Sequence, residues 1–315
     1  YKVNFSFVGT NKGNYKTSKN SNNLRVYEWV PPIDGMPQGS YEPVILLVTP
    51  KTQLMTVSGM QYDYKNMNIK SEFAFSQKDM NTFSDIDNKA SKGYATNLEL
   101  GRNDTIKNNN NQLKTTIKYE FKQANFRQIE PYRNTEFTRD WNLNDINSNF
   151  NEHLIGFQET YNNSKINLKA SYRFTSLIRQ KNYQGFESQI PITWNYKNIE
   201  LNADFKHLST KDTTLSTSFF RPNIQMAYAI QKAKGLKFGI NYLQENNRIQ
   251  NIIADTLSNN SFKFNIAGLN ISLPDSNKWS FNLDYKFRND FNGLNNQMHI
   301  QSFANLIDFK GSANA

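Results

Sequence analysis

The feature that most constrains the fold is a strict alternation of polar and apolar residues over stretches of about ten. In residues 165–174, KINLKASYRF, every odd-numbered residue is polar and every even-numbered residue is apolar. Successive side chains of a β-strand point to opposite faces, so this period of two predicts a strand with one apolar and one charged face. The same pattern recurs in residues 69–75, 112–122, 198–206, 236–242 and 278–287.

The connections between these stretches alternate in length. Short polar turns are predicted near residues 64–67, 105–111, 162–165, 195–198, 231–234 and 274–277. Longer loops are predicted at residues 78–92, 123–150, 175–184, 209–216 and 245–260. This order is typical of an up-and-down meander with short turns at one end and long loops at the other. In residues 261–273 the alternation slips near Ala267 and Gly268, which predicts a bulge or kink there.

Composition narrows the class of protein. The 315 residues include no cysteine, so neither disulfides nor thiolate metal sites are expected. Aromatic residues make up 14% although the mean hydropathy is −0.74, which argues against disorder. The net charge of +10 would suit nucleic acid or an anionic membrane, but the lysines are spread along one face of every strand instead of forming one patch. No nucleic-acid partner is therefore predicted, and no apolar run is long enough for a helical membrane span.

Two architectures could use such strands. A soluble sandwich has strands of about five to six residues and packs one face of each sheet against the other. A transmembrane barrel has strands of about 9–11 residues, with the apolar face toward lipid and the polar face toward a lumen. The stretches of about ten residues and the high charge of their polar face favour the second. We predict an all-β, antiparallel, up-and-down transmembrane β-barrel of 12 to 16 strands, an even number, with short periplasmic turns and long extracellular loops.

This architecture assigns individual side chains to the two sides of the barrel wall. The residues predicted to face the lumen are Lys114, Lys118, Lys165, Lys169, Arg173, Asp204, Lys206 and Lys286. Those predicted to face lipid are Ile166, Leu168, Tyr172, Phe174, Phe205, Phe238, Trp279 and Phe281.

Residues 1–50 differ from the remainder. They are predicted to begin as a strand and not as a signal peptide. They hold several Gly and Pro residues and contain one continuous apolar run at 44–48 that suits burial on both faces. They are predicted to form a separate β segment that leads into the barrel, a plug or its first strands. Residues 51–309 are predicted to form the barrel and residues 310–315 a tail.

Three stretches carry a family resemblance. Residues 25–44 (RVYEWVPPIDGMPQGSYEPV), 71–88 (SEFAFSQKDMNTFSDIDN) and 131–143 (PYRNTEFTRDWNL) resemble the large, mostly uncharacterised outer-membrane proteins of the Bacteroidota. In those proteins periplasmic β domains precede a C-terminal barrel, so the resemblance implies a bacterial outer-membrane location but no reaction. Such barrels usually end on an aromatic residue, whereas this chain ends FKGSANA. A truncated chain, an added tail or a barrel completed by other segments would each explain that departure.

Two of the predicted loops hold candidate sites. Asp79, Asn81, Asp85 and Asp87 could offer oxygen ligands to Ca²⁺, although the spacing is not that of an EF-hand and an acidic, Asn-rich loop is more often a solvated turn. No other cofactor is predicted. In the longest loop the charged and aromatic residues could fold inward as a plug or remain exposed: Arg127, Arg133, Glu136, Arg139 and Trp141.

Little in the sequence indicates catalysis. The three histidines, His153, His207 and His299, stand in no recognisable nucleophile, metal or phosphate motif, so the chain is predicted not to be an enzyme. Two tripeptides in predicted long loops, Asp-Thr-Thr at 212–214 and Asp-Thr-Leu at 255–257, resemble the O-glycosylation signal of Bacteroidota. Glycosylation at these signals would modify Thr213 and Thr256.

The predicted function is a non-catalytic outer-membrane pore whose basic lumen favours anions. The first alternative is a structural or assembly subunit of an outer-membrane secretion, uptake or barrel-insertion complex, with an occluded lumen. A more distant alternative is a barrel-borne lipid enzyme. The predicted partners are outer-membrane lipid and lipopolysaccharide, with other outer-membrane proteins or lipoproteins as further candidates.

Overall fold

The computed structural model describes residues 3–18, 25–45, 49–83, 92–106, 110–143, 150–180, 182–230, 235–273, 279–294 and 297–313. The chain forms two compact units. One unit comprises Tyr1–Thr52 with Asp79–Ile86, and the other comprises Gln53–Lys78 with Asp87–Ala315.

The first unit contains a small antiparallel sheet in the order β1-β4-β2-β3. Its strands are β1 (Ser6–Phe7), β2 (Tyr15–Thr17), β3 (Tyr27–Trp29) and β4 (Tyr41–Glu42). Aromatic rings hold it together: Phe5 stacks on Tyr27 with ring centroids 4.4 Å apart and meets Tyr15 edge to face. The predicted buried apolar strand at 44–48 is wrong for its first two residues, because Val44 and Ile45 follow β4 outside any strand and are exposed. Residues 46–48 lie outside the described part of the chain.

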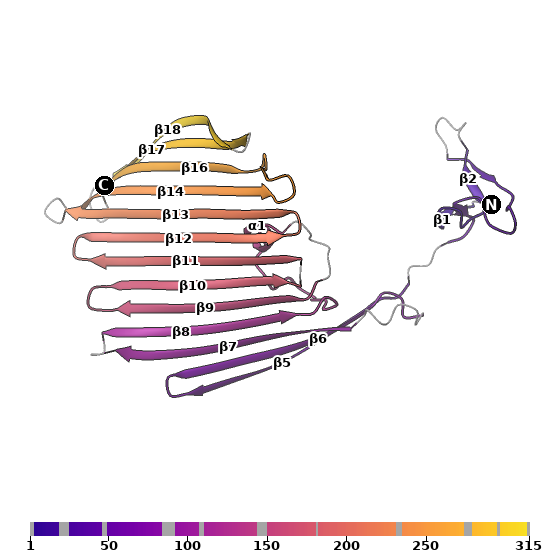
Figure 1. Ribbon diagram of the computed structural model, residues 1–315, viewed down its shortest axis with the longest axis horizontal. Helices are drawn as coiled ribbons and strands as arrows, with labels where there is room; N and C mark the ends of the chain where they lie inside the picture. Colours follow the sequence, from indigo (N-terminus) through magenta and orange to yellow (C-terminus); the bar gives the residue numbers. More distant parts are fainter. Residues whose placement is uncertain are drawn as a thin grey trace. The chain divides into compact units, whose positions relative to one another are not determined.

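The second unit is dominated by one large sheet (Figure 1). Its strands are β5 (Thr52–Tyr64), β6 (Met67–Asp79), β7 (Lys92–Ile106), β8 (Asn111–Lys122), β9 (Glu152–Asn163), β10 (Leu168–Arg179), β11 (Tyr183–Tyr196), β12 (Ile199–Asp212), β13 (Leu215–Ile230), β14 (Leu236–Asn251), β15 (Thr256–Leu257), β16 (Phe262–Leu273), β17 (Trp279–Leu294) and β18 (Gln297–Ala313). Each long strand pairs with the next one along the chain, and the short β15 pairs only with β14. The prediction of an all-β, antiparallel, up-and-down sheet is confirmed.

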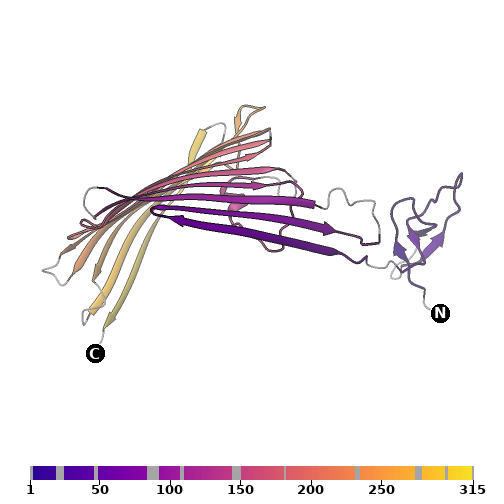
Figure 2. The same ribbon diagram turned by 90° about the horizontal axis from the view of Figure 1, so that it is seen from below.

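The strand register sorts the side chains onto two faces, since directly opposed residues in antiparallel strands point the same way. Lys206 lies opposite Gln189 and Arg221, whereas Phe205 lies opposite Ile190 and Pro222. We call the face with Lys206 the polar face and the face with Phe205 the apolar face. Figure 2 shows that the strand direction changes steadily from the indigo strands to the yellow ones, which is the twist expected of a large sheet.

Several predicted boundaries are wrong. The long strands run for 12 to 17 residues instead of about ten, because their polar ends continue the ladder. The loops predicted at 175–184 and 209–216 shrink to three and two residues between strands, at 180–182 and 213–214. Lys165 and Ile166 lie in the turn before β10 and not in a strand. Residues 310–313 continue β18 and do not form a tail.

The predicted bulge at Ala267 and Gly268 is also wrong, because β16 keeps a continuous register with β14 and β17 through both residues. The alternation slips there because apolar side chains change face. Phe264 and Ile266 occupy the polar face, whereas Leu269 occupies the apolar face. The register shift that does occur lies between Asp290 and Phe291.

The sheet has two edges in the described part of the chain. β5 and β18 end the path and do not pair with each other. The path contains an odd number of long strands, thirteen, which departs from the predicted even number. β5 and β18 therefore run in the same direction. Among the described residues no helix is long and apolar enough to cross a membrane; the one α-helix, α1, spans only Phe137–Asp140.

Candidate functional site: a docked segment on the polar face

Residues 123–143, which follow β8, lie against the polar face, and we call them the docked segment. The segment starts by crossing β7 closely: a Cβ on Gly93 would lie 2.2 Å from the backbone nitrogen of Phe126, so only glycine fits there. The Arg127 backbone N–H donates a 2.8 Å hydrogen bond to the hydroxyl of Ser76, which is fully buried. The described part of this loop therefore packs against the polar face of the sheet.

Ion pairs fasten the middle of the docked segment. The Arg133 guanidinium reaches Glu120 through one nitrogen and Glu152 through another, in short charge-assisted hydrogen bonds. Glu152 is only 3% exposed and also accepts from Arg179 at 2.8 Å and from Lys122 at 3.4 Å. Three cations therefore surround one buried carboxylate.

Arg133 remains charged in this setting. Burial lowers the pKa of its guanidinium, but Glu120, Tyr132 and Glu152 outweigh that effect and raise the pKa above its ordinary value. The guanidinium also lies 4.4 Å from the centre of the Phe137 ring. The sequence predicted Arg133 as a plug residue, and in the structure its partners on the strands are the carboxylates of Glu120 and Glu152.

The end of the docked segment forms an apolar core on the polar face. Trp141 is 5% exposed, and its backbone carbonyl accepts a 2.5 Å hydrogen bond from the Tyr183 hydroxyl. A Cβ on Gly185 would lie 2.9 Å from the Trp141 ring, so a glycine on β11 makes room for the indole. The residues that pack with Trp141 are Leu143, Leu177, Tyr183, Leu208 and Phe219, with Phe137, Leu154 and Ile249 at the periphery.

Sequence reasoning missed this core, although a signal was present. Leu177, Leu208 and Phe219 occupy positions that the alternation assigns to the polar face. Leu177 and Leu208 are each the single departure within their strands, and β13 also carries Leu215 on this face. The register aligns Leu177 with Leu154 and Leu208 with Phe219 on neighbouring strands, so the departures form one patch. Aligning the strands by their turns before looking for departures would have revealed it.

The other two plug candidates behave differently. Glu136 and Arg139 pair with each other at 3.0 Å on the exposed side of α1. They contact solvent more than sheet, with side chains 48% and 73% exposed. A pair in this setting contributes little to stability.

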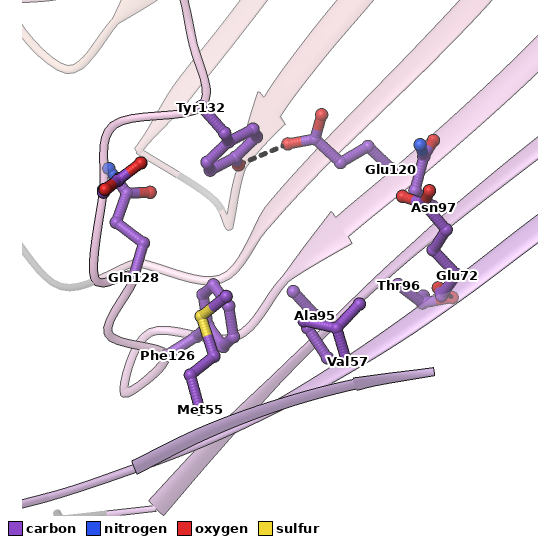
Figure 3. Close-up of a pocket in the computed structure, with 12 residues that line it drawn as sticks. Met55, Val57, Glu72, Ala95, Thr96, Asn97, Glu120, Phe126, Gln128 and Tyr132 are labelled. Carbon is purple, nitrogen blue, oxygen red and sulfur yellow. Dashed lines mark hydrogen bonds between the residues drawn. The ribbon is translucent and has the colours of Figure 1, made fainter. Parts of the chain in front are cut away.

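A pocket of about 220 Å³ opens beside the docked segment, over β5 to β8 (Figure 3). Apolar side chains contributed by the strands and by the docked segment form much of its lining: Met55, Val57, Ala74, Ala95 and Phe126. Glu72, Glu120 and Glu130 add carboxylates. Tyr132 donates a 2.7 Å hydrogen bond to Glu120, drawn as a dashed line in Figure 3. No Lys or Arg lines the pocket, so it can accept an apolar group beside negative charge.

The side chains predicted to face a lumen share the polar face, apart from Lys165 in its turn. Their positive charge is partly compensated: Lys118 pairs with Glu99 at 3.0 Å and Lys206 with Glu187 at 2.8 Å. Arg173 donates to Gln189, which in turn donates to Asp204. Within the described residues Lys114, Lys169 and Lys286 form no ion pair.

The side chains predicted to face lipid share the apolar face. Tyr172, Phe174, Phe205, Phe238 and Phe281 all belong to it, and Leu168 lies opposite Trp194 there. Ile166 belongs to the turn instead. The side chain of Trp279 lies outside the described part of the structure.

The remaining candidates are scattered. Asp79 accepts a hydrogen bond from the Asn81 backbone in a local turn, while Asp85 and Asp87 lie outside the described residues. The described residues contain no group of three or more His, Asp or Glu side chains that could hold a metal ion. His153 meets the Tyr119 hydroxyl at 2.9 Å and His207 meets Ser218 at 3.3 Å, while the side chain of His299 is not described.

The two glycosylation candidates, Thr213 and Thr256, are both exposed. Thr213 lies in the two-residue turn between β12 and β13, where Asp212 accepts hydrogen bonds from the Thr214 and Leu215 backbones. This turn gives Asp212 a structural role of its own.

Comparison of the chain with protein-family models, with curated proteins and with solved structures finds no match.

Proposed function

We propose that the large sheet is the wall of a β-barrel in a bacterial outer membrane, and that its polar face lines a non-catalytic aqueous passage. The observation that carries this proposal is the exposed apolar face. Large apolar side chains remain solvent-accessible from β7 to β18 and no second layer covers them among the described residues: Leu98, Leu100, Ile117, Ile155, Tyr172, Phe186, Ile190, Met226, Tyr228, Phe238, Ile240, Leu269, Leu283, Tyr285, Ile307 and Phe309. Water-soluble sheets bury such a face, whereas lipid solvates it.

Closing the wall needs strands beyond these thirteen. Because β5 and β18 run in the same direction, pairing them directly would create a parallel seam. Single-chain bacterial barrels have even strand numbers and antiparallel seams. Lipid offers no hydrogen-bond partner to an open strand edge, so both edges must be paired in a membrane. We infer that an odd number of further strands completes the barrel.

The passage is expected to prefer anions weakly. Carboxylates on the polar face neutralise several cations, including Arg221 by Glu245 and Lys237 by Glu200. Cations without an ion pair among the described residues remain on this face, including Lys70, Lys114, Lys169, Arg173 and Lys286, and these would attract anions. The docked segment lies on the same face and narrows the space beside β5 to β13.

Single-channel recording in planar bilayers tests the proposal. We expect a steady conductance in KCl with a modest anion preference. Replacing residues 124–143 by a short Gly-Ser linker should raise the conductance, because the docked segment is removed. A protein that inserts and conducts in neither form would overturn the passage.

A second candidate function is a structural or assembly subunit with an occluded passage. The docked segment favours it, because the buried Trp141 core and the Glu152 ion pairs resemble a permanent contact more than a movable gate. Bilayer insertion without conductance, together with other outer-membrane proteins or lipoproteins recovered in pull-downs from native membranes, would support this candidate.

A further inference from the structure

The polar face carries a second hollow, distinct from the pocket beside the docked segment. It measures about 620 Å³ and extends over β7 to β10, close to their short turns. Three lysines line it, Lys114, Lys118 and Lys169. Amide side chains, which can both donate and accept hydrogen bonds, make up much of the rest: Asn103, Gln112, Gln158 and Asn162.

The charge of this hollow is uncompensated at two positions. Its carboxylates are already engaged, since Glu99 pairs with Lys118 at 3.0 Å and Asp104 pairs with Arg102 at 2.8 Å. Lys114 and Lys169 reach no carboxylate among the described residues, and both side chains are exposed to the hollow's solvent.

The strand register brings these two lysines toward each other. Lys114 on β8 lies opposite Thr160 on β9, and Lys169 on β10 lies opposite Asn162, two residues further along the same strand. Two strand spacings and two residues of rise separate their Cα atoms by roughly 12 Å. Two extended lysine side chains, each about 6 Å long, can close that gap on a shared anion.

The surface between the two lysines consists of side chains that are held in place by hydrogen bonds. Thr160 and Ser171 are buried and hydrogen-bond to each other at 2.9 Å, and Gln158 donates to Thr160 at 3.1 Å. The hollow therefore has a fixed polar floor with two cationic groups above it.

We propose that Lys114 and Lys169 bind the dianionic phosphate group of a small soluble solute, whose remaining polar groups contact the surrounding amides. Two ammonium groups that approach from different strands suit a tetrahedral dianion better than a single carboxylate. No aromatic side chain lines the hollow, so the solute needs no ring to stack. The site deepens the proposed function, on which its role in transport rests, because it would hold an anion at the short-turn end of the passage.

Calorimetric titration of the detergent-purified protein with inorganic phosphate tests the site. We expect saturable binding of phosphate and at least tenfold weaker binding of acetate. Lys114→Gln and Lys169→Gln should each weaken phosphate binding tenfold or more. Lys286→Gln is the matched control, because it removes a cation of the same face outside this hollow, and it should change binding less than twofold.

The inference is overturned if the wild-type protein shows no saturable phosphate binding, or if the Lys114 and Lys169 variants bind like the Lys286 variant. Its failure is distinguishable from failure of the passage. Conductance in KCl without phosphate binding would contradict only the proposed phosphate site. Phosphate binding without conductance would contradict only the proposed passage.

Discussion

At the scale of single residues, a few side chains decide where the docked segment lies. Glu152 gathers Arg133, Arg179 and Lys122 around one buried carboxylate. Burying charges costs several kcal/mol for each ion, and only good geometry recovers that cost. Removing the central charge should therefore matter far more than removing an exposed one.

We expect Glu152→Gln to destabilise the protein by about 3–5 kcal/mol, because three cations lose their shared counter-charge in a buried site. Glu136→Gln, which breaks the exposed pair with Arg139, should cost about 0–1 kcal/mol. Urea unfolding in lipid vesicles measures both. Equal effects of the two substitutions would show that the buried cluster is not the main attachment.

The apolar face provides a second prediction at this scale. Met226 and Gln225 are neighbours in β13, both exposed, on opposite faces. Met226→Arg should destabilise the membrane-inserted protein by about 2–4 kcal/mol, because the charge would enter lipid. Gln225→Arg should change stability little, since that side chain faces water. Refolding yields in vesicles compare the two, and a negligible effect of Met226→Arg would indicate that the apolar face does not contact lipid.

At the scale of elements, the docked segment is a loop with its own attachment points. Ordering a loop of this length costs conformational entropy, which contacts with other groups must offset. In this loop the offsetting contacts are with the polar face of its own sheet. Gly93 leaves room for its close approach to β7, Arg133 forms its ion pairs with the strands, and Trp141 packs in the buried apolar core.

Trp141→Ala should release the end of the segment, because removing a large buried aromatic side chain costs about 3–5 kcal/mol. Ile129→Ala, at an exposed position of the same segment, is the control. Limited proteolysis should cut residues 123–143 much faster in the Trp141 variant than in the wild type or the control. Unchanged cleavage in all three would mean that the core does not hold the segment.

At the scale of the whole sheet, the strand count decides how the wall can close. With thirteen long strands in one path, the first and last strands point the same way. Both edge strands are exposed over most of their described length.

Disulfide trapping tests the closure, and the chain has no native cysteine to interfere. If further strands separate β5 from β18, Met60→Cys should form no disulfide with cysteines placed at Asn305, Ile307 or Phe309. The pair Tyr285→Cys and Ile307→Cys, which lie opposite each other on adjacent strands, is the positive control. Efficient trapping between β5 and β18 would instead establish a direct parallel seam.

How much the sequence could predict differs between these scales. Alternation identified the strands and their faces, because the period of two is a property of the strand backbone alone. It failed at strand ends. Thr210, placed in a loop by the sequence, hydrogen-bonds to Thr217 at 2.6 Å across a hairpin. Polar residues that continue a ladder are indistinguishable from loop residues until the strands are paired.

The amino-acid sequence by itself determined a two-faced, antiparallel, all-β chain, since side-chain alternation and turn residues act locally. Only the tertiary structure decided that residues 123–143 fold onto the polar face. That choice depends on Glu120, Glu152, Leu177 and Phe219 being brought together by the register of six strands, β8 to β13. The open edges and the odd strand count are likewise properties of the assembled sheet, because no single strand specifies how many neighbours its ladder will have.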